Sequence, residues 1–202
     1  TGSVLFMDDT DYGQTHEYSI SNINDGKVTS KAYDLAQNVT THTFICDTWP
    51  PFAATGLTAD HLVSTWYGKE KASITAGWEP AKDDTDHVSN PADVSCIAGY
   101  SISWNYKAVD VPDPVKDIDA VSSYASPELS DGQNHYFHIR SVDKAGNWDD
   151  AAVDIGPFWI DATKPNIIIS IIDEIEEKLP DGTVLYIKSM TFGVSVTDSI
   201  VN

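Results

Sequence analysis

The chain has 202 residues, of which 41% are hydrophobic and 10% aromatic, so it is long enough and apolar enough to bury a core. Lys and Arg number 12 and Asp and Glu number 31, which gives a formal net charge of −19 at pH 7. Such a charge repels nucleic-acid phosphates and anionic membranes, and no run of about 18 apolar residues is present to span a bilayer. We therefore expect neither nucleic-acid binding nor membrane insertion.

The acidic composition leaves several interpretations open. It suits a soluble extracellular protein, a high-salt setting or divalent-cation binding, and a simply solvated acidic surface explains it equally well. The two cysteines, Cys46 and Cys96, are too few for a disulfide-rich scaffold and do not have the pattern of a zinc site.

The predicted secondary structure is almost entirely strand. Apolar and polar residues alternate with a period of two in many short segments, and Asp-Gly, Asn and Pro separate these segments. The predicted strands cover residues 73–78, 98–106, 135–142, 156–161, 184–189 and 192–198. The apolar run 167–172 also has strand length, and only 173–179 could form a helical turn, which Pro180-Asp181-Gly182 would end.

The segment HYFHIRSV at 135–142 illustrates the alternation. Phe137 and Ile139 fall on one face, which we expect to be the core face, whereas His138 and Arg140 fall on the other. Many short strands with frequent turn signals are typical of an antiparallel β-sandwich.

Two stretches of the chain, residues 25–51 and 131–165, follow the same order of features. Each has an Asp-Gly turn, a strand, the pattern Asp-x-Ala-x-Asn, and a second strand that closes with Asp and then Pro. Asn and Gly tolerate positive φ and Asp can bond its own backbone, so the pattern predicts a hairpin turn. The second copy reads DKAGN at this turn, and the first reads DLAQN, with Gln37 in place of Gly146.

The second copy resembles a known family. YFHIRSVDKAGNW, followed by GPFWIDATKP, is similar to the last two strands of fibronectin type III-like and of bacterial or archaeal immunoglobulin-like repeats. CIAGYSISWN resembles the third strand of the same unit, with Trp104 as its core tryptophan. The resemblance covers about residues 48–162. It implies an extracellular or cell-surface location, because such domains serve as spacers and stalks in surface proteins, adhesins and secreted hydrolases.

With 48–162 as a complete fibronectin III-like or immunoglobulin-like domain, the two chain ends are complementary. Residues 1–47 supply the C-terminal strands of one immunoglobulin-like domain, and residues 163–202 supply the N-terminal strands of the next. The expected fold is therefore all-β, with tandem sandwiches, one complete and one split between the ends. A half sandwich leaves open strand edges and an uncovered apolar face. We expect copies of the chain to complete each other head to tail, in a covalent array or by strand exchange.

In a sandwich of this strand order, the loops at 80–97 and 143–150 lie at the pole where the chain enters. The end of the preceding strand brings Cys46 to the same pole, so a disulfide to Cys96 is expected, with two buried free thiols as the alternative.

The same pole gathers five carboxylates. Calcium takes about six to eight oxygen ligands, and acidic loops supply them, although no loop matches the EF-hand pattern. Calcium and solvated acidic loops both remain open for this set, which comprises Asp47, Asp83, Asp84, Asp86 and Asp143. Separately, the sequon NVT makes Asn38 a candidate for N-glycosylation.

No catalytic constellation is visible in the sequence, and we expect no enzyme activity. Histidines are available, yet neither cysteine has a nucleophile signature around it. The expected function is a structural extracellular repeat protein that forms a stalk, layer or filament. The rival is a carbohydrate- or ligand-binding accessory module of a secreted or surface protein. It requires an exposed row of aromatic rings or a lined groove, and the candidates for the row are Trp66, Tyr67, Tyr106 and Tyr124.

Overall fold

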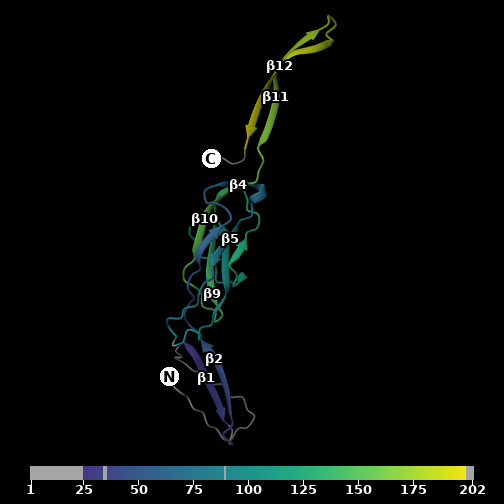
Figure 1. Cartoon of the computed structure of the whole chain (residues 1–202). Helices are drawn as coiled ribbons and strands as arrows, with labels where there is room; N and C mark the ends of the chain where they lie inside the picture. Colours follow the sequence, from purple (N-terminus) through teal and green to yellow (C-terminus); the bar gives the residue numbers. More distant parts are fainter. Residues whose placement is uncertain (1–24, 34–35, 89, 199–202) are drawn as a thin grey trace.

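The computed structural model describes residues 25–33, 36–88 and 90–198. Two hairpins project from opposite ends of a central body that consists of two sheets (Figure 1). The hairpins are formed by β1 (Gly26–Tyr33) with β2 (Val39–Cys46), and by β11 (Asn166–Lys178) with β12 (Val184–Thr197). The predicted all-β fold is confirmed, and one short 3-10 turn, η1 (Lys69–Lys71), is the helical element of the described ranges.

The central body contains the remaining eight strands in two sheets. One sheet has the order β3-β5-β8 and the other has the order β4-β10-β9-β6-β7. Neighbouring strands are antiparallel except β4 and β10, which are parallel. The strands are β3 (Thr55–Ala59), β4 (Trp66–Gly68), β5 (Thr75–Glu79), β6 (Ile97–Asn105), β7 (Ile118–Asp119), β8 (Ser123–Ala125), β9 (Gly132–Asp143) and β10 (Val153–Asp161).

The core lies between these two sheets, so the body is sandwich-like. Trp78 on β5 packs edge-on to Tyr100 on β6, with ring centroids 5.4 Å apart, and stacks on Phe137 of β9 at 5.8 Å. Phe137 and Ile139 are 0% and 1% exposed, as the alternation predicts. Each such side chain contributes about 1.5–3 kcal/mol on burial, which holds the sheets face to face.

His138 departs from the expected pattern because it is buried on the outward face of β9. Its Nδ1 lies 2.6 Å from Asp154 Oδ1, and its Nε2 lies 3.0 Å from Asn105 Oδ1. The Asn105 amide in turn donates to Asp110 at 2.7 Å. Polar partners therefore surround the imidazole, which lets a polar side chain be fully covered at this position.

The two copies of the Asp-x-Ala-x-Asn pattern share a backbone conformation at their fourth position. Gln37 and Gly146 occupy the same position of Asp-x-Ala-x-Asn, and both have positive φ, 66° and 93°. Only a residue in the left-handed region closes this turn, and Gln37 adopts it at the energetic cost that a Cβ imposes there.

The Asp-Gly turns of the two copies also make matching contacts. Asp25 accepts hydrogen bonds from the amide of Thr48 at 2.9 Å and from its hydroxyl at 2.8 Å. Asp131 accepts from the amide of Ala162 at 2.6 Å and from the hydroxyl of Thr163. In both copies an aspartate therefore holds the segment that leaves the second strand.

The second hairpin is longer than predicted. β11 runs on through Lys178, so the helical turn considered for 173–179 is wrong. Pairing with β12 gives that segment its backbone partners, whereas an isolated helical turn of this length would be marginal. The turn predicted at Pro180-Asp181-Gly182 is present and ends this segment. There the Gly182 amide donates to the Leu179 carbonyl at 2.8 Å, and Gly182 has φ 88°.

Candidate cation site at the entry of the central body

Three carboxylates meet where the chain passes from the first hairpin into the central body. Asp47 follows β2, Asp83 lies in the loop after β5, and Asp143 ends β9. One oxygen from each lies within 4.8 Å of the other two. The three come from segments far apart in sequence, and the expected strand order predicts all three at this pole.

Backbone amides fix the orientation of Asp47 and Asp83. The amide of Ser95 donates to Asp47 Oδ2 at 2.8 Å. The amides of Cys96 and Asp84 donate to the two oxygens of Asp83. The loop after β5 and the segment before β6 are therefore both tied to the carboxylates.

The Asp-x-Ala-x-Asn turn holds Asp143. Asn147 donates to it twice, from its backbone amide at 2.9 Å and from its side-chain amide at 2.8 Å. The same side-chain amide reaches the carbonyl of Asp47 at 3.1 Å. Asn147 thus ties the hairpin turn to the incoming chain.

Burial and mutual repulsion shape the electrostatics of the cluster. Asp143 is 2% exposed and Asp83 is 9% exposed. Burial raises the pKa of Asp83, and the charges of Asp47 and Asp143 raise it further, against the lowering effect of the Cys96 amide. Within the described ranges no Lys, Arg or His forms an ion pair with any of the three.

The spacing of the three carboxylates is compatible with the binding of a single hard cation. Calcium binds oxygen at about 2.3–2.6 Å, so two ligands of one ion can stand about 5 Å apart. The observed limit of 4.8 Å between the carboxylate oxygens meets that condition. Asp47, Asp83 and Asp143 therefore have the donor type and a spacing compatible with one such ion, and they supply three of the roughly six to eight oxygens that calcium takes.

Asp84 and Asp86 do not join the cluster. Asp84 Oδ2 lies 3.1 Å from His87 Nδ1, and Asp84 Oδ1 accepts from the amide of Asp86 at 2.8 Å. His87 stacks on Trp49 with ring centroids 3.6 Å apart. These residues build the turn beside the cluster and are not ligand candidates in this arrangement.

The two cysteines are free thiols in this structure, so the predicted disulfide is not formed in it. Their segments nevertheless lie side by side, because Asp47 and Ser95, their neighbours in sequence, are hydrogen-bonded. Cys46 is half-buried at the end of β2, and Cys96 is exposed with φ 69°. The pairing of Cys46 with Cys96 stays a prediction.

Asn38 is exposed immediately before β2 begins at Val39. N-glycosylation of Asn38 stays a prediction.

The aromatic candidates for a ligand-binding row are scattered. Trp66 is 38% exposed and tilts against Trp159, while Tyr106 is 59% exposed and lies against His135. Tyr67 is half-buried beside His61, and Tyr124 packs on the main core. These four candidates do not line up in a row.

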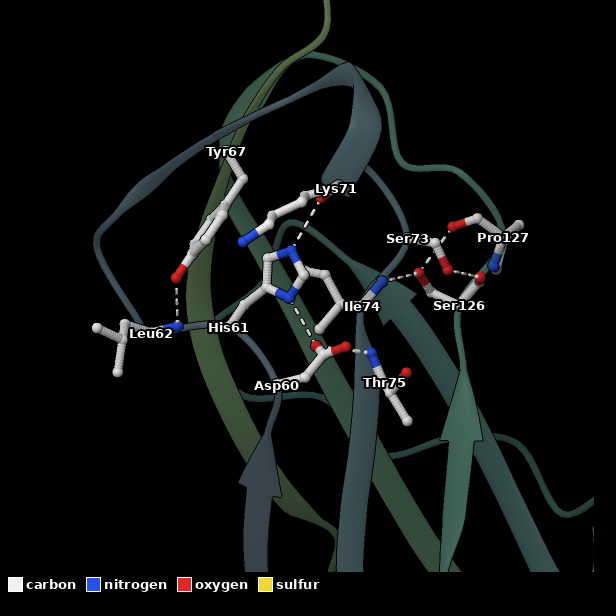
Figure 2. A network of polar contacts seen from close by, with 10 residues as sticks. All are labelled: Asp60, His61, Leu62, Tyr67, Lys71, Ser73, Ile74, Thr75, Ser126 and Pro127. Carbon is white, nitrogen blue, oxygen red and sulfur yellow. Dashed lines mark hydrogen bonds and ion pairs between the residues drawn. The ribbon is translucent and has the colours of Figure 1, made fainter.

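A polar network that was not predicted from the sequence lies between the loop before β4 and the start of β5 (Figure 2). His61 is 7% exposed, and its two ring nitrogens lie 2.6 Å from Asp60 Oδ1 and 2.9 Å from the Lys71 carbonyl. Burial alone would raise the pKa of Asp60, but hydrogen bonds from His61 and Thr75 outweigh it and lower that pKa. An adjacent Asp-His pair was the only signal available in the sequence.

The nearby serines do not complete a catalytic arrangement with His61. Ser73 donates its hydroxyl to the Ser126 carbonyl at 2.7 Å, and Ser126 donates to the Pro127 carbonyl at 2.7 Å (Figure 2). Both hydroxyls are thus engaged with backbone, away from the imidazole. The network fixes η1 and its flanking loops to β5.

In comparisons with known proteins, no family model, no curated protein and no solved structure matches this chain. The described part of the chain also contains no helix with the length and hydropathy needed to cross a membrane.

Proposed function

We propose that the chain is a structural, extracellular repeat unit that builds a surface stalk, layer or filament by head-to-tail completion of immunoglobulin-like domains. One observation carries this proposal. A sandwich-like body stands between two isolated two-stranded sheets, and these lie at opposite ends (Figure 1).

Two-stranded sheets of this kind are marginal in water. Among the described residues each has two open edges, and an isolated hairpin lacks the second layer that would bury its apolar face. In β11–β12 the unburied apolar surface is large: eight apolar side chains are each more than half exposed, namely Ile167, Ile168, Ile169, Ile171, Ile172, Phe192, Val194 and Val196. At about 25 cal/mol per Å² of apolar surface, covering them favours association strongly.

Calcium belongs to the same proposal. An ion shared by Asp47, Asp83 and Asp143 links the end of the first hairpin to two loops of the central body. The ion would also remove the repulsion among the three carboxylates. Its structural effect would be a stiffer joint between successive units, which suits a stalk or filament.

The rival function, a carbohydrate- or ligand-binding accessory module, has less support. Sugar binding by stacking needs several rings on one surface. Trp66 and Tyr106 are exposed on different elements, each against a partner ring of its own.

Negative-stain electron microscopy of the whole chain in calcium tests the proposal. We expect rods or fibres with an axial repeat of about two sandwich lengths. Particles of single-chain size at every concentration would contradict a role in head-to-tail assembly. Retention on immobilised polysaccharide by such single particles would favour the rival.

A further inference from the structure

We propose that the apolar face of β11–β12 packs face to face on the Val28–Phe44 face of the β1–β2 hairpin of a second copy. This inference rests on the proposed head-to-tail function and names the two surfaces that would meet. The apolar face is defined by the cross-strand pairs Ile167–Val196, Ile169–Val194 and Ile171–Phe192.

The register of β11–β12 separates its two faces clearly. Directly paired residues of an antiparallel sheet share a face, so the three apolar pairs form one continuous surface. The opposite face is mixed: it carries the exposed Ile168 and Ile172, but also Ser170, Ser195 and Gly193, where an added Cβ would lie 2.9 Å from Ile172. Only the first face is uniformly apolar, and each of its six side chains is between 56% and 66% exposed.

The two faces of the β1–β2 hairpin differ in charge. One face carries Lys27 and Lys31 together with threonines, including the pair Thr29 and Thr43, and with the apolar Val39 and Ile45. Lysine is almost never buried without a partner, so this face stays in water. The other face carries no Lys, Arg, Asp or Glu in the described strands, and on it Val28 stands opposite Phe44 and Ser30 opposite His42.

The central body supplies an internal template for the contact. Counted back from Asp-x-Ala-x-Asn, Val28 and Ser30 occupy the positions that Phe137 and Ile139 occupy in β9. In the central body that face is covered by the sheet containing Trp78. In the described part of the first hairpin, no sheet covers the equivalent face.

Charge favours the first hairpin over a second β11–β12 as the partner. The strands β11 and β12 contain four Asp and Glu residues and two Lys residues. The strands of β1–β2 contain Lys27 and Lys31 and no carboxylate. Two β11–β12 hairpins would repel, whereas the unlike hairpins attract.

The placement of the hairpins makes the contact intermolecular. They lie at opposite ends of the central body, so one chain cannot bring its own two surfaces together without a large bend (Figure 1). A contact between unlike surfaces leaves one free end on each partner, and it therefore extends as an open chain unless the rotation closes it.

Paired variants test the surfaces by light scattering of the whole chain. Val194→Glu places a charge on the apolar face, and Ser195→Glu places the same charge on the opposite face of the same strand. Phe44→Glu and Thr43→Glu form the matching pair on β2. We expect Val194→Glu and Phe44→Glu to be monomeric, and the two controls to assemble like the wild type.

Mixing then separates the possible modes of contact. Val194→Glu keeps an intact first hairpin and Phe44→Glu keeps an intact second hairpin, so an equimolar mixture should form a one-to-one dimer and stop there. If Phe44→Glu alone dimerises, β11–β12 pairs with itself and the inference is wrong. If the wild type assembles and all four variants assemble equally, other surfaces are used and the inference fails, while the proposed function stands. A monomeric wild type would contradict both this inference and the proposed function.

Discussion

Asp131 accepts hydrogen bonds from the amide of Ala162, at 2.6 Å, and from the hydroxyl of Thr163, and so holds the start of the segment that leads to β11. These bonds, first that from Thr163, lower the pKa of Asp131 below its ordinary value. A carboxyl with a lowered pKa in the folded state stabilises the fold above the pKa of the unfolded chain. This contribution is lost as the pH falls through the folded pKa.

We therefore expect Asp131→Ala to loosen the joint between β10 and β11. Amide hydrogen exchange of Ala162 should become faster near neutral pH, because its acceptor has been removed. The exposed Asp150→Ala serves as the control and should leave that amide unchanged. Unchanged exchange of the Ala162 amide in Asp131→Ala would show that the hydrogen bonds of Asp131 do not hold the joint between β10 and β11.

Calcium should stabilise the wild-type chain through Asp47, Asp83 and Asp143. A ligand that binds only the folded state at about a hundred-fold excess over its dissociation constant adds about 2.7 kcal/mol to the free energy of unfolding. We expect a higher Tm in calcium, and a clearly smaller rise in Asp83→Asn. Asp86→Asn, which lies outside the cluster, should respond like the wild type. Equal responses of wild type and Asp83→Asn to millimolar calcium would exclude this cluster as the site.

In chelator, the pH dependence of the same substitution reports the repulsion among the carboxylates. Burial, and then the neighbouring carboxylates, raise the pKa of Asp83, so its ionised form weakens the folded state. This penalty is fully present above the folded pKa and disappears as the pH falls toward the unfolded value. Asn has one oxygen for the two backbone amides that donate to Asp83, a loss that does not depend on pH. Without calcium, the stability of the wild type should therefore rise relative to that of Asp83→Asn as the pH falls through the folded pKa of Asp83. Thermal melts of both chains in chelator across pH check the sign, and a difference that does not change with pH would contradict it.

A bond between Cys46 and Cys96 is expected to form under oxidising conditions, because the adjacent residues Asp47 and Ser95 already touch. A crosslink closing a loop of this size typically adds about 2–4 kcal/mol to the free energy of unfolding. Mass spectrometry without reductant should show the two peptides joined, and Cys96→Ser should abolish the joined species. Two titratable thiols per chain after oxidation would count against it.

Gln37 and Gly146 provide a matched pair for the turn geometry. Gln37 has φ 66°, a conformation that costs a residue with a Cβ about 1 kcal/mol or more. Gln37→Gly should relieve that strain, and slower amide exchange in the first hairpin would report it. Gly146→Ala introduces the same strain at φ 93° and should lower the Tm of the central body. The turn assignment is wrong if Gln37→Gly weakens the hairpin.

Local sequence signals predict much of this fold. Alternation in 135–142 identifies Phe137 and Ile139 as core residues, and both are buried. The pattern Asp-x-Ala-x-Asn predicts both hairpin turns, including the one where Gln37 replaces glycine. Turn chemistry and side-chain period act over a few residues, which is why one sequence suffices to read them.

Features that depend on tertiary contacts were harder to predict. The acidic loop after β5 supplied three candidates, and only Asp83 joins Asp47 and Asp143, because backbone amides of distant loops select its orientation. His138 occupies a position of the solvent face by periodicity, yet Asp154 and Asn105 make its burial possible. The segment 173–178 is strand because β12 pairs with it.

Sedimentation velocity of the whole chain in calcium, from micromolar to hundreds of micromolar protein, tests the central claim most directly. Head-to-tail assembly through unlike hairpins predicts a weight-average sedimentation coefficient that rises with concentration and shows no plateau at the dimer. A single species of monomer mass throughout that range would contradict the account, as would a closed dimer that stops growing.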